Sequence, residues 1–165
     1  MHVWSQADET MPYREHKAFY GPIMSANKQN EKIPNLFIIG AMKSGTTSLH
    51  NYLNTHPFVY MSKPKELWYF VEEKNWKKGQ DWYLSHFQNV DHEIFLGESS
   101  ADYTMYPHLQ KVPEKMYEFN KNSYLIYILR DPVDRALSHY WYDVRIGHQK
   151  HAMYKAISTE KKYAD

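Results

Sequence analysis

The sequence predicts an α/β fold: a central, mostly parallel sheet flanked by helices in three layers. Short apolar segments alternate along the chain with stretches of helical periodicity, which is typical of parallel strands buried on both faces. A glycine-bearing turn joins the first of these strands directly to a helix, as in the first half of a βαβ unit. The 165 residues are 42% hydrophobic and 16% aromatic, which is enough for one domain with a real core and excludes a wholly disordered chain.

Composition excludes several classes of protein. The chain has no cysteine, so a disulfide scaffold, a thiolate nucleophile and cysteine-based zinc sites are all excluded. Its 20 Lys and Arg against 19 Asp and Glu give a net charge of +1, which argues against nucleic acid as a partner. No apolar run approaches the ~20 residues of a membrane span, and residues 1–30 lack the apolar core of a signal peptide. We therefore expect a cytoplasmic protein without a membrane partner.

The predicted elements follow a polar, irregular arm at residues 1–32 and make up a domain at residues 33–165. A strand at residues 33–40 comes first, and a helix then runs to about Thr55 with a stripe of Leu49, Tyr52 and Leu53. The further predicted elements are strands at 58–61, 94–98 and 124–129 and a short helix at 79–87. Residues 107–120 are expected to form two helical pieces, because Pro113 is not tolerated inside a helix.

The last third of the chain predicts two more helices. Asp131 followed by Pro132 indicates an N-cap and a proline at the first helical position. The expected buried face of this helix consists of Val133, Leu137, Tyr140, Trp141 and Val144. A final helix is predicted at about residues 152–163.

The most informative segment is the turn GAMKSGTT at residues 40–47. A phosphate group needs several inward-pointing N–H groups, and a glycine-bearing loop that leads into a helix N-terminus supplies them. Gly45 allows close approach of the backbone, Lys43 adds a positive charge, and Thr46 and Thr47 add hydroxyl donors. The alternative interpretation is a plain strand-to-helix turn that is rich in small residues.

This turn is not a Walker A loop. In that motif the lysine directly follows the last glycine, and a Ser or Thr that holds Mg²⁺ comes next. Here Lys43 stands two residues before Gly45, inside the loop, which argues against a metal-dependent NTPase.

A second informative segment surrounds Arg130. This arginine follows a predicted parallel strand, at the carboxyl edge where α/β folds bind ligands, and its planar guanidinium can bind a phosphate with two hydrogen bonds. Ser138 and Arg135, in the helix that follows, point away from its apolar stripe. A surface arginine with a serine on a helix face is the alternative. Asp131 could imitate a Walker B acid but is better explained as a helix cap.

With both segments in place, the chain resembles the sulfotransferases that use 3′-phosphoadenosine 5′-phosphosulfate (PAPS), specifically the bacterial and heparan-sulfate-type branch. KSGTT at 43–47 is similar to the family's 5′-phosphosulfate loop, and Arg130 with Ser138 is similar to its 3′-phosphate motif. PKELWYF at 64–70 and GESSADY at 97–103 resemble two further family segments, in the family's order. The likeness covers about residues 33–163 and implies a P-loop-like fold.

The resemblance also implies roles for individual residues. Lys43, Ser44, Gly45, Thr46 and Thr47 would bind the 5′-phosphosulfate, with Lys43 also stabilising the charge on the leaving phosphate. Residues Arg130 and Ser138 would bind the 3′-phosphate. In the segment at 64–70, Glu66 is the candidate general base. The donor would be PAPS, no metal is expected, and a sulfuryl group would pass to a hydroxyl or amine of a carbohydrate or small-molecule acceptor.

Several of these residues have a simpler interpretation. Lys65 and Glu66 could be a solvated ion pair on an edge strand. His86, His92 and His108 are more typical of surface histidines than of bases. Residues His148 and His151 could share a helix face, but no third metal ligand follows them.

The family's domain normally continues well beyond the position of residue 165. We therefore expect a truncated product, or a minimal form that a second copy or another chain completes. This leaves two main hypotheses: a PAPS-dependent sulfotransferase, and a catalytically incomplete binding or assembly module that retains the nucleotide pocket. A P-loop kinase of a small molecule is a weaker third hypothesis.

Overall fold

The computed structural model describes residues 32–159. The predicted polar arm at residues 1–32 therefore lies, except for Lys32, outside the described residues, as does the end of the helix predicted at residues 152–163. Within the described range, no helix is long and apolar enough to cross a membrane.

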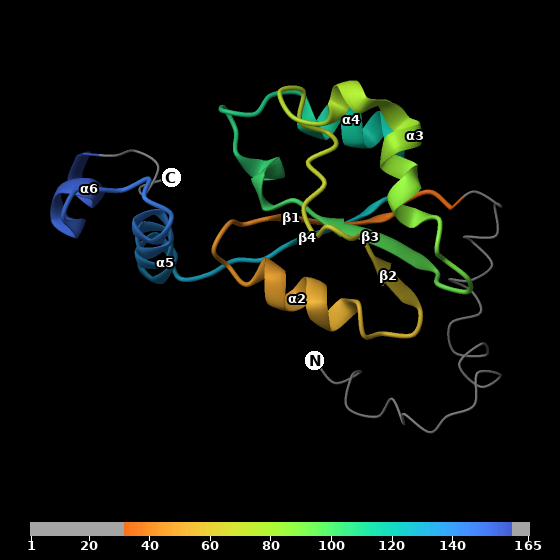
Figure 1. The fold of residues 1–165 in the computed structure, drawn as a ribbon, viewed down its shortest axis with the longest axis horizontal. Coiled ribbons are helices and arrows are strands. Elements are labelled where there is room, and N and C mark those ends of the chain that lie inside the picture. Colours follow the sequence, from red (N-terminus) through yellow and green to blue (C-terminus); the bar gives the residue numbers. More distant parts are fainter. Residues whose placement is uncertain (1–31, 160–165) are drawn as a thin grey trace. The chain divides into compact units, whose positions relative to one another are not determined.

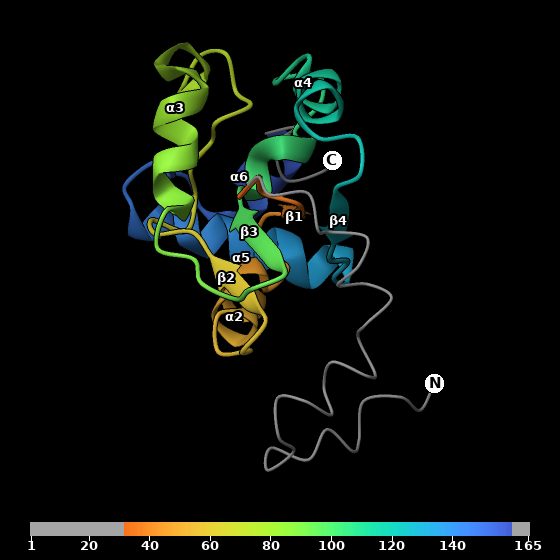
Figure 2. The same cartoon turned by 90° about the vertical axis from the view of Figure 1, so that its right-hand side faces the viewer.

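Four parallel strands form a single sheet in the order β2-β3-β1-β4. They are β1 (Leu36–Gly40), β2 (Val59–Met61), β3 (Phe95–Ser99) and β4 (Tyr124–Tyr127). Figure 2 shows the four strands side by side in this order. The predicted α/β class with a mostly parallel sheet is confirmed. Because all four strands run in the same direction, the loops that follow them leave from one edge of the sheet.

Helices cover both faces of this sheet, as Figure 1 shows. Helix α2 (Thr46–Leu53) lies on one face, and α3 (Gly79–Leu84) and α4 (Val112–Phe119) lie on the other. Three 3₁₀ turns connect these elements: η1 (Trp76–Lys78), η2 (Ser85–Phe87) and η3 (Ala101–Thr104). The three predicted layers are thus present.

The central strand β1 contributes to the core on both sides. Phe37 is fully buried in a large aromatic cluster with residues such as Phe70 and Tyr83, while Ile38 points to the opposite face, where Leu49 and other α2 side chains pack. Burying an aromatic or aliphatic side chain of this kind contributes about 1.5–3 kcal/mol. The continuous apolar run predicted a strand that is buried on both faces, and the two sides of β1 are buried in this way.

Two details of the predicted helices are wrong. Residues 107–120 do not form two helical pieces: turns precede a single helix, α4, in which Pro113 stands in the first turn, where its missing N–H is not needed. In α2, Tyr52 is 74% exposed, and Thr46 and His50 are the buried residues of that helix.

The helix after Arg130 differs most from its prediction. Asp131 does cap α5 (Pro132–Arg145), because its carboxylate accepts hydrogen bonds from the N–H groups of Val133 and Asp134. Of the predicted buried face, however, only Tyr140 is buried, and Val133 and Trp141 are 65% and 59% exposed. The reason is that α5 packs through Tyr140 against α6 (Met153–Thr159) instead of placing its whole apolar stripe on the sheet.

Candidate functional site

The loop between β1 and α2 leaves hydrogen-bond donors without acceptors. Gly45 is the N-cap of α2, with a left-handed φ of 95°, and no side chain caps this helix end. The hydroxyl of Ser44 is buried and has no hydrogen-bond partner among the described residues. Uncapped N–H groups at a helix N-terminus carry partial positive charge and bind anions. The loop therefore has the chemistry of an anion-binding site.

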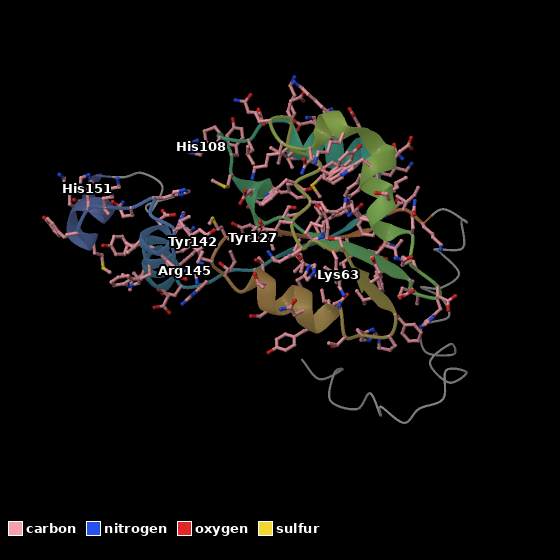
Figure 3. The ribbon with its side chains drawn as sticks, viewed as in Figure 1. Lys63, His108, Tyr127, Tyr142, Arg145 and His151 are labelled. Atoms are coloured by element: carbon pink, nitrogen blue, oxygen red, sulfur yellow. The ribbon has the colours of Figure 1, made fainter. Side chains whose placement is uncertain are left out.

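Lys43 lies in this loop and reaches towards α5. Its backbone is left-handed, with φ 68°, and its Nζ lies 4.3 Å from the centroid of the Tyr142 ring. The guanidinium of Arg145 lies 5.4 Å from the centroid of the same ring. Figure 3 labels Tyr142 and Arg145, which both project from α5. Burial lowers the pKa of Lys43, the charges of Arg145 and Arg130 lower it further, and Asp143 acts in the opposite direction.

Arg130 contacts the same loop from the next strand. It follows the end of β4, and its Nη1 donates a hydrogen bond of 3.1 Å to the backbone oxygen of Lys43. The structure thus brings together the two segments that were singled out in the sequence, although 87 positions separate these residues. Three cationic side chains, from Lys43, Arg130 and Arg145, consequently surround one end of the loop.

The structure supports the other predicted binding residues less directly. Thr46 is buried in the first turn of α2, and Thr47 is exposed beside it. Ser138 is half-buried on α5 and makes no side-chain hydrogen bond within the described part of the chain. These three roles stay predictions, as do those of the other site residues.

Glu66 lies in an irregular segment between β2 and η1. The alternative interpretation, an ion pair on an edge strand, is therefore wrong in placing Glu66 on a strand. The ion pair itself is present: Lys65 Nζ lies 2.6 Å from Glu66 Oε1, and the Glu66 side chain is 30% exposed. A partly exposed carboxylate beside a cation is accessible to a ligand and can accept a proton.

The segment that carries Glu66 is held by residues of the GESSADY stretch at the end of β3. The N–H of Ser99 donates to the Lys65 oxygen at 3.3 Å, and the hydroxyl of Ser100 accepts from the N–H of Trp68 at 3.0 Å. The hydroxyl of Tyr103 accepts from the N–H of Phe70 at 3.5 Å. The stretch at residues 97–103 therefore holds the segment that carries Glu66 in place through hydrogen bonds to its backbone.

Glu98, in the same stretch, is fully buried. The pKa of its carboxyl is raised to about 8, mainly by burial, and the charge of Glu66 contributes in the same direction. The hydroxyls of Tyr103, Ser100 and Tyr83 oppose this shift, but neither oxygen of Glu98 makes a hydrogen bond of good geometry with the described residues. The group is therefore mostly a neutral carboxylic acid at neutral pH.

Sequence reasoning missed three residues near these groups: Tyr142, Arg145 and His50. Arg145 comes seven positions after Ser138, two turns along the same helix, which is a weak signal for a shared face. His50 comes four positions after Thr46 and shares its buried face. Neither spacing distinguishes a site residue from a core or surface residue.

Comparison with known proteins agrees with this geometry. Residues 34–163 match the sulfotransferase domain family. The membrane-associated sulfotransferase kil1 of Dictyostelium discoideum is 36% identical over 116 residues, which are 68% of this chain and 24% of that protein. The human bifunctional heparan sulfate N-deacetylase/N-sulfotransferase 3 is 32% identical over 149 residues, which are 83% of this chain and 16% of that protein.

Among solved structures, a sulfotransferase from Alicyclobacillus acidocaldarius matches with a TM-score of 0.69 and 31% identity, over 79% of this chain and 58% of that one. The chain thus spans less than a quarter of the length of these two curated relatives. The likeness to heparan-sulfate-type and bacterial members that the motifs predicted is confirmed. Since the domain match covers most of the sequence, the chain belongs to the sulfotransferase family.

Proposed function

We propose that this chain transfers a sulfuryl group from PAPS to a hydroxyl or amine of an acceptor. The observation that supports this most strongly is the contact between Arg130 and the backbone of Lys43, beside the uncapped N-terminus of α2. Cations and unpaired N–H donors gathered at one place fit a ligand with several anionic groups. PAPS is such a ligand, because it carries a phosphosulfate at one end and a separate phosphate on the ribose.

The donor's 5′ end would be bound by the N–H groups of residues 45–47, since the N–H of Ser44 already donates to the oxygen of Ala41. The buried hydroxyl of Ser44, which has no partner among the described residues, and the hydroxyls of Thr46 and Thr47 would add further donors. Arg130 and Ser138 would bind the 3′-phosphate. Lys43 would also bind the phosphosulfate, and the acceptor would approach from the side of Glu66.

In the transfer, the bond between sulfur and the phosphate oxygen breaks, and a bond forms between sulfur and the acceptor oxygen or nitrogen. Glu66 takes the proton that the acceptor loses. Lys43 stabilises the negative charge that stays on the phosphate oxygen, and stabilisation of this kind commonly contributes 10²- to 10³-fold to turnover. The proposal uses no metal. Thr46 stands where a Walker A loop has its lysine, and Lys43, which lies inside the loop, supplies the positive charge at the leaving phosphate oxygen.

The proposal for the acceptor is broader than the proposal for the donor. The name of one relative, the human bifunctional heparan sulfate N-deacetylase/N-sulfotransferase 3, mentions heparan sulfate, which is a carbohydrate. For this chain we propose a carbohydrate or small-molecule acceptor, without choosing between oxygen and nitrogen.

Calorimetric titration tests the donor part of the proposal. We expect adenosine 3′,5′-bisphosphate, the donor product, to bind equally well in EDTA and in Mg²⁺. Transfer of radiolabelled sulfate from PAPS to a panel of amino sugars and alcohols then separates an enzyme from a module that only binds the nucleotide. A preference for ATP with Mg²⁺ over the bisphosphate would contradict the proposal and favour a kinase.

A further inference from the structure

His50 is a buried polar residue that the proposed mechanism does not use. It lies on the inner face of α2, one turn after Thr46, and is 6% exposed. The neighbouring inner residues Leu49 and Leu53 pack against the sheet in the ordinary apolar way. An imidazole at such a position costs free energy of desolvation unless it makes hydrogen bonds, so its partners need an explanation.

The partners of His50 lie at the ends of two strands. Its Nδ1 is 2.9 Å from the hydroxyl of Ser99, at the end of β3. The backbone of Ser62, just after β2, interacts with the same imidazole and partly opposes the lowering of its pKa. Burial lowers the pKa of His50 to about 4, and the charge of Lys65 contributes to this shift. The imidazole is therefore neutral at the pH of ordinary assays, with one donor and one acceptor nitrogen for these two contacts.

Both partners are themselves bonded to the residues just before Glu66. The N–H of Ser99 donates to the oxygen of Lys65 at 3.3 Å. The hydroxyl of Ser62 donates to the oxygens of Pro64 and Lys65, at 3.1 and 3.4 Å. Hydrogen bonds through Ser99, and the interaction with Ser62, thus connect His50 of α2 to Lys65, the residue that precedes Glu66.

The same helix begins at the loop that carries Lys43. We propose that His50 is a positioning residue, which fixes the segment of Glu66 relative to the donor loop through Ser99 and Ser62. His50 acts on Glu66 through the backbone of Lys65 and has no described contact with Glu66 itself. This inference rests on the proposed function, since it assigns His50 to the placement of the proposed base.

Kinetics with a matched pair of variants tests the inference. His50→Leu removes the hydrogen bond to Ser99 and the interaction with Ser62 at similar volume. His50→Asn can retain the bond to Ser99, because its amide lies where Nδ1 does. We expect His50→Leu to lower kcat about tenfold, which corresponds to ~1.4 kcal/mol, with the Kd for adenosine 3′,5′-bisphosphate unchanged. His50→Asn should recover part of this loss. The exposed Tyr52→Leu, on the same helix, is the control and should match the wild type.

A double variant separates positioning from general weakening of the fold. In the Glu66→Gln background there is no base to position, so adding His50→Leu should lower kcat no further. An equal loss of kcat in both backgrounds, or a kcat of His50→Leu that matches the wild type, would overturn the inference. So would a loss that appears only as weaker binding of the bisphosphate.

Hydrogen exchange provides a test that does not depend on transfer activity. Replacing His50 should speed exchange at the N–H groups of Ser99 and Trp68, which bond to the two sides of the Glu66 segment. Exchange in residues 41–47 should not change. If the wild-type chain binds no bisphosphate and transfers no sulfate, the proposed function fails, whereas unchanged exchange at these two amides overturns the role of His50. Ser99→Ala, which removes only one partner, repeats the measurement if His50→Leu does not fold.

Discussion

The buried carboxyl of Glu98 makes the stability of the protein depend on pH in a predictable way. Its pKa is about 8 in the folded protein, against an ordinary value of 4.5, because burial penalises the charged form. Below pH 4.5 the group is protonated in both the folded and the unfolded chain and has no effect. As the pH rises from 4.5 to 8, the unfolded chain releases the proton and the folded chain retains it, so folding becomes less favourable.

The size of this effect follows from the two pKa values. Each pH unit between them costs about 1.4 kcal/mol, so the folded protein at pH 7 is destabilised by about 3 kcal/mol relative to a group that cannot ionise. Glu98→Gln keeps the shape and polarity of the neutral acid and removes its ionisation. The variant should therefore match the wild type near pH 4.5 and exceed its stability by a growing margin up to pH 8.

Urea unfolding of both proteins at several pH values between 4.5 and 8.5 measures this difference. Other titrating groups cancel, because the two proteins share them. Glu118→Gln, the same substitution at an exposed position of α4, gives the baseline for the change in side chain. A stability difference between Glu98→Gln and the wild type that stays constant over this pH range would refute the reasoning.

Three further predictions concern the proposed site. Lys43→Ala should lower turnover by about 2.7–4 kcal/mol, by analogy with a lost oxyanion donor; a wild-type rate in a sulfate-transfer assay would contradict its role. Arg130→Ala should weaken binding of adenosine 3′,5′-bisphosphate by about 1.5–3 kcal/mol, as measured by calorimetry, and unchanged affinity would argue against it. Glu66→Gln should lower kcat and leave bisphosphate affinity intact; weaker binding would instead make Glu66 a structural residue.

The sequence predicts the sheet and the donor loop because their signals are local. The apolar run around Ile38 is continuous, and Gly45 at the start of α2 supplies the left-handed turn that its position requires. The cap of α5 by Asp131 is equally local, because the carboxylate bonds to N–H groups two and three residues ahead.

Features that depend on distant contacts could not be predicted in this way. The apolar periodicity of α5 indicates a buried face, but which part is buried depends on where α6 packs, so Val133 and Trp141 are exposed. His50 and Ser99 are 49 positions apart, and nothing in the sequence near His50 indicates the hydroxyl that it meets. The same holds for Tyr142, whose ring meets Lys43 from another element.

A crystal structure of this chain with adenosine 3′,5′-bisphosphate would test the central claim most directly. The account predicts that the 5′-phosphate lies against the N–H groups of residues 45–47 and the hydroxyl of Ser44, and that the guanidinium of Arg130 contacts the 3′-phosphate. A nucleotide bound elsewhere on the protein, with residues 44–47 free of it and Arg130 turned away, would contradict the account.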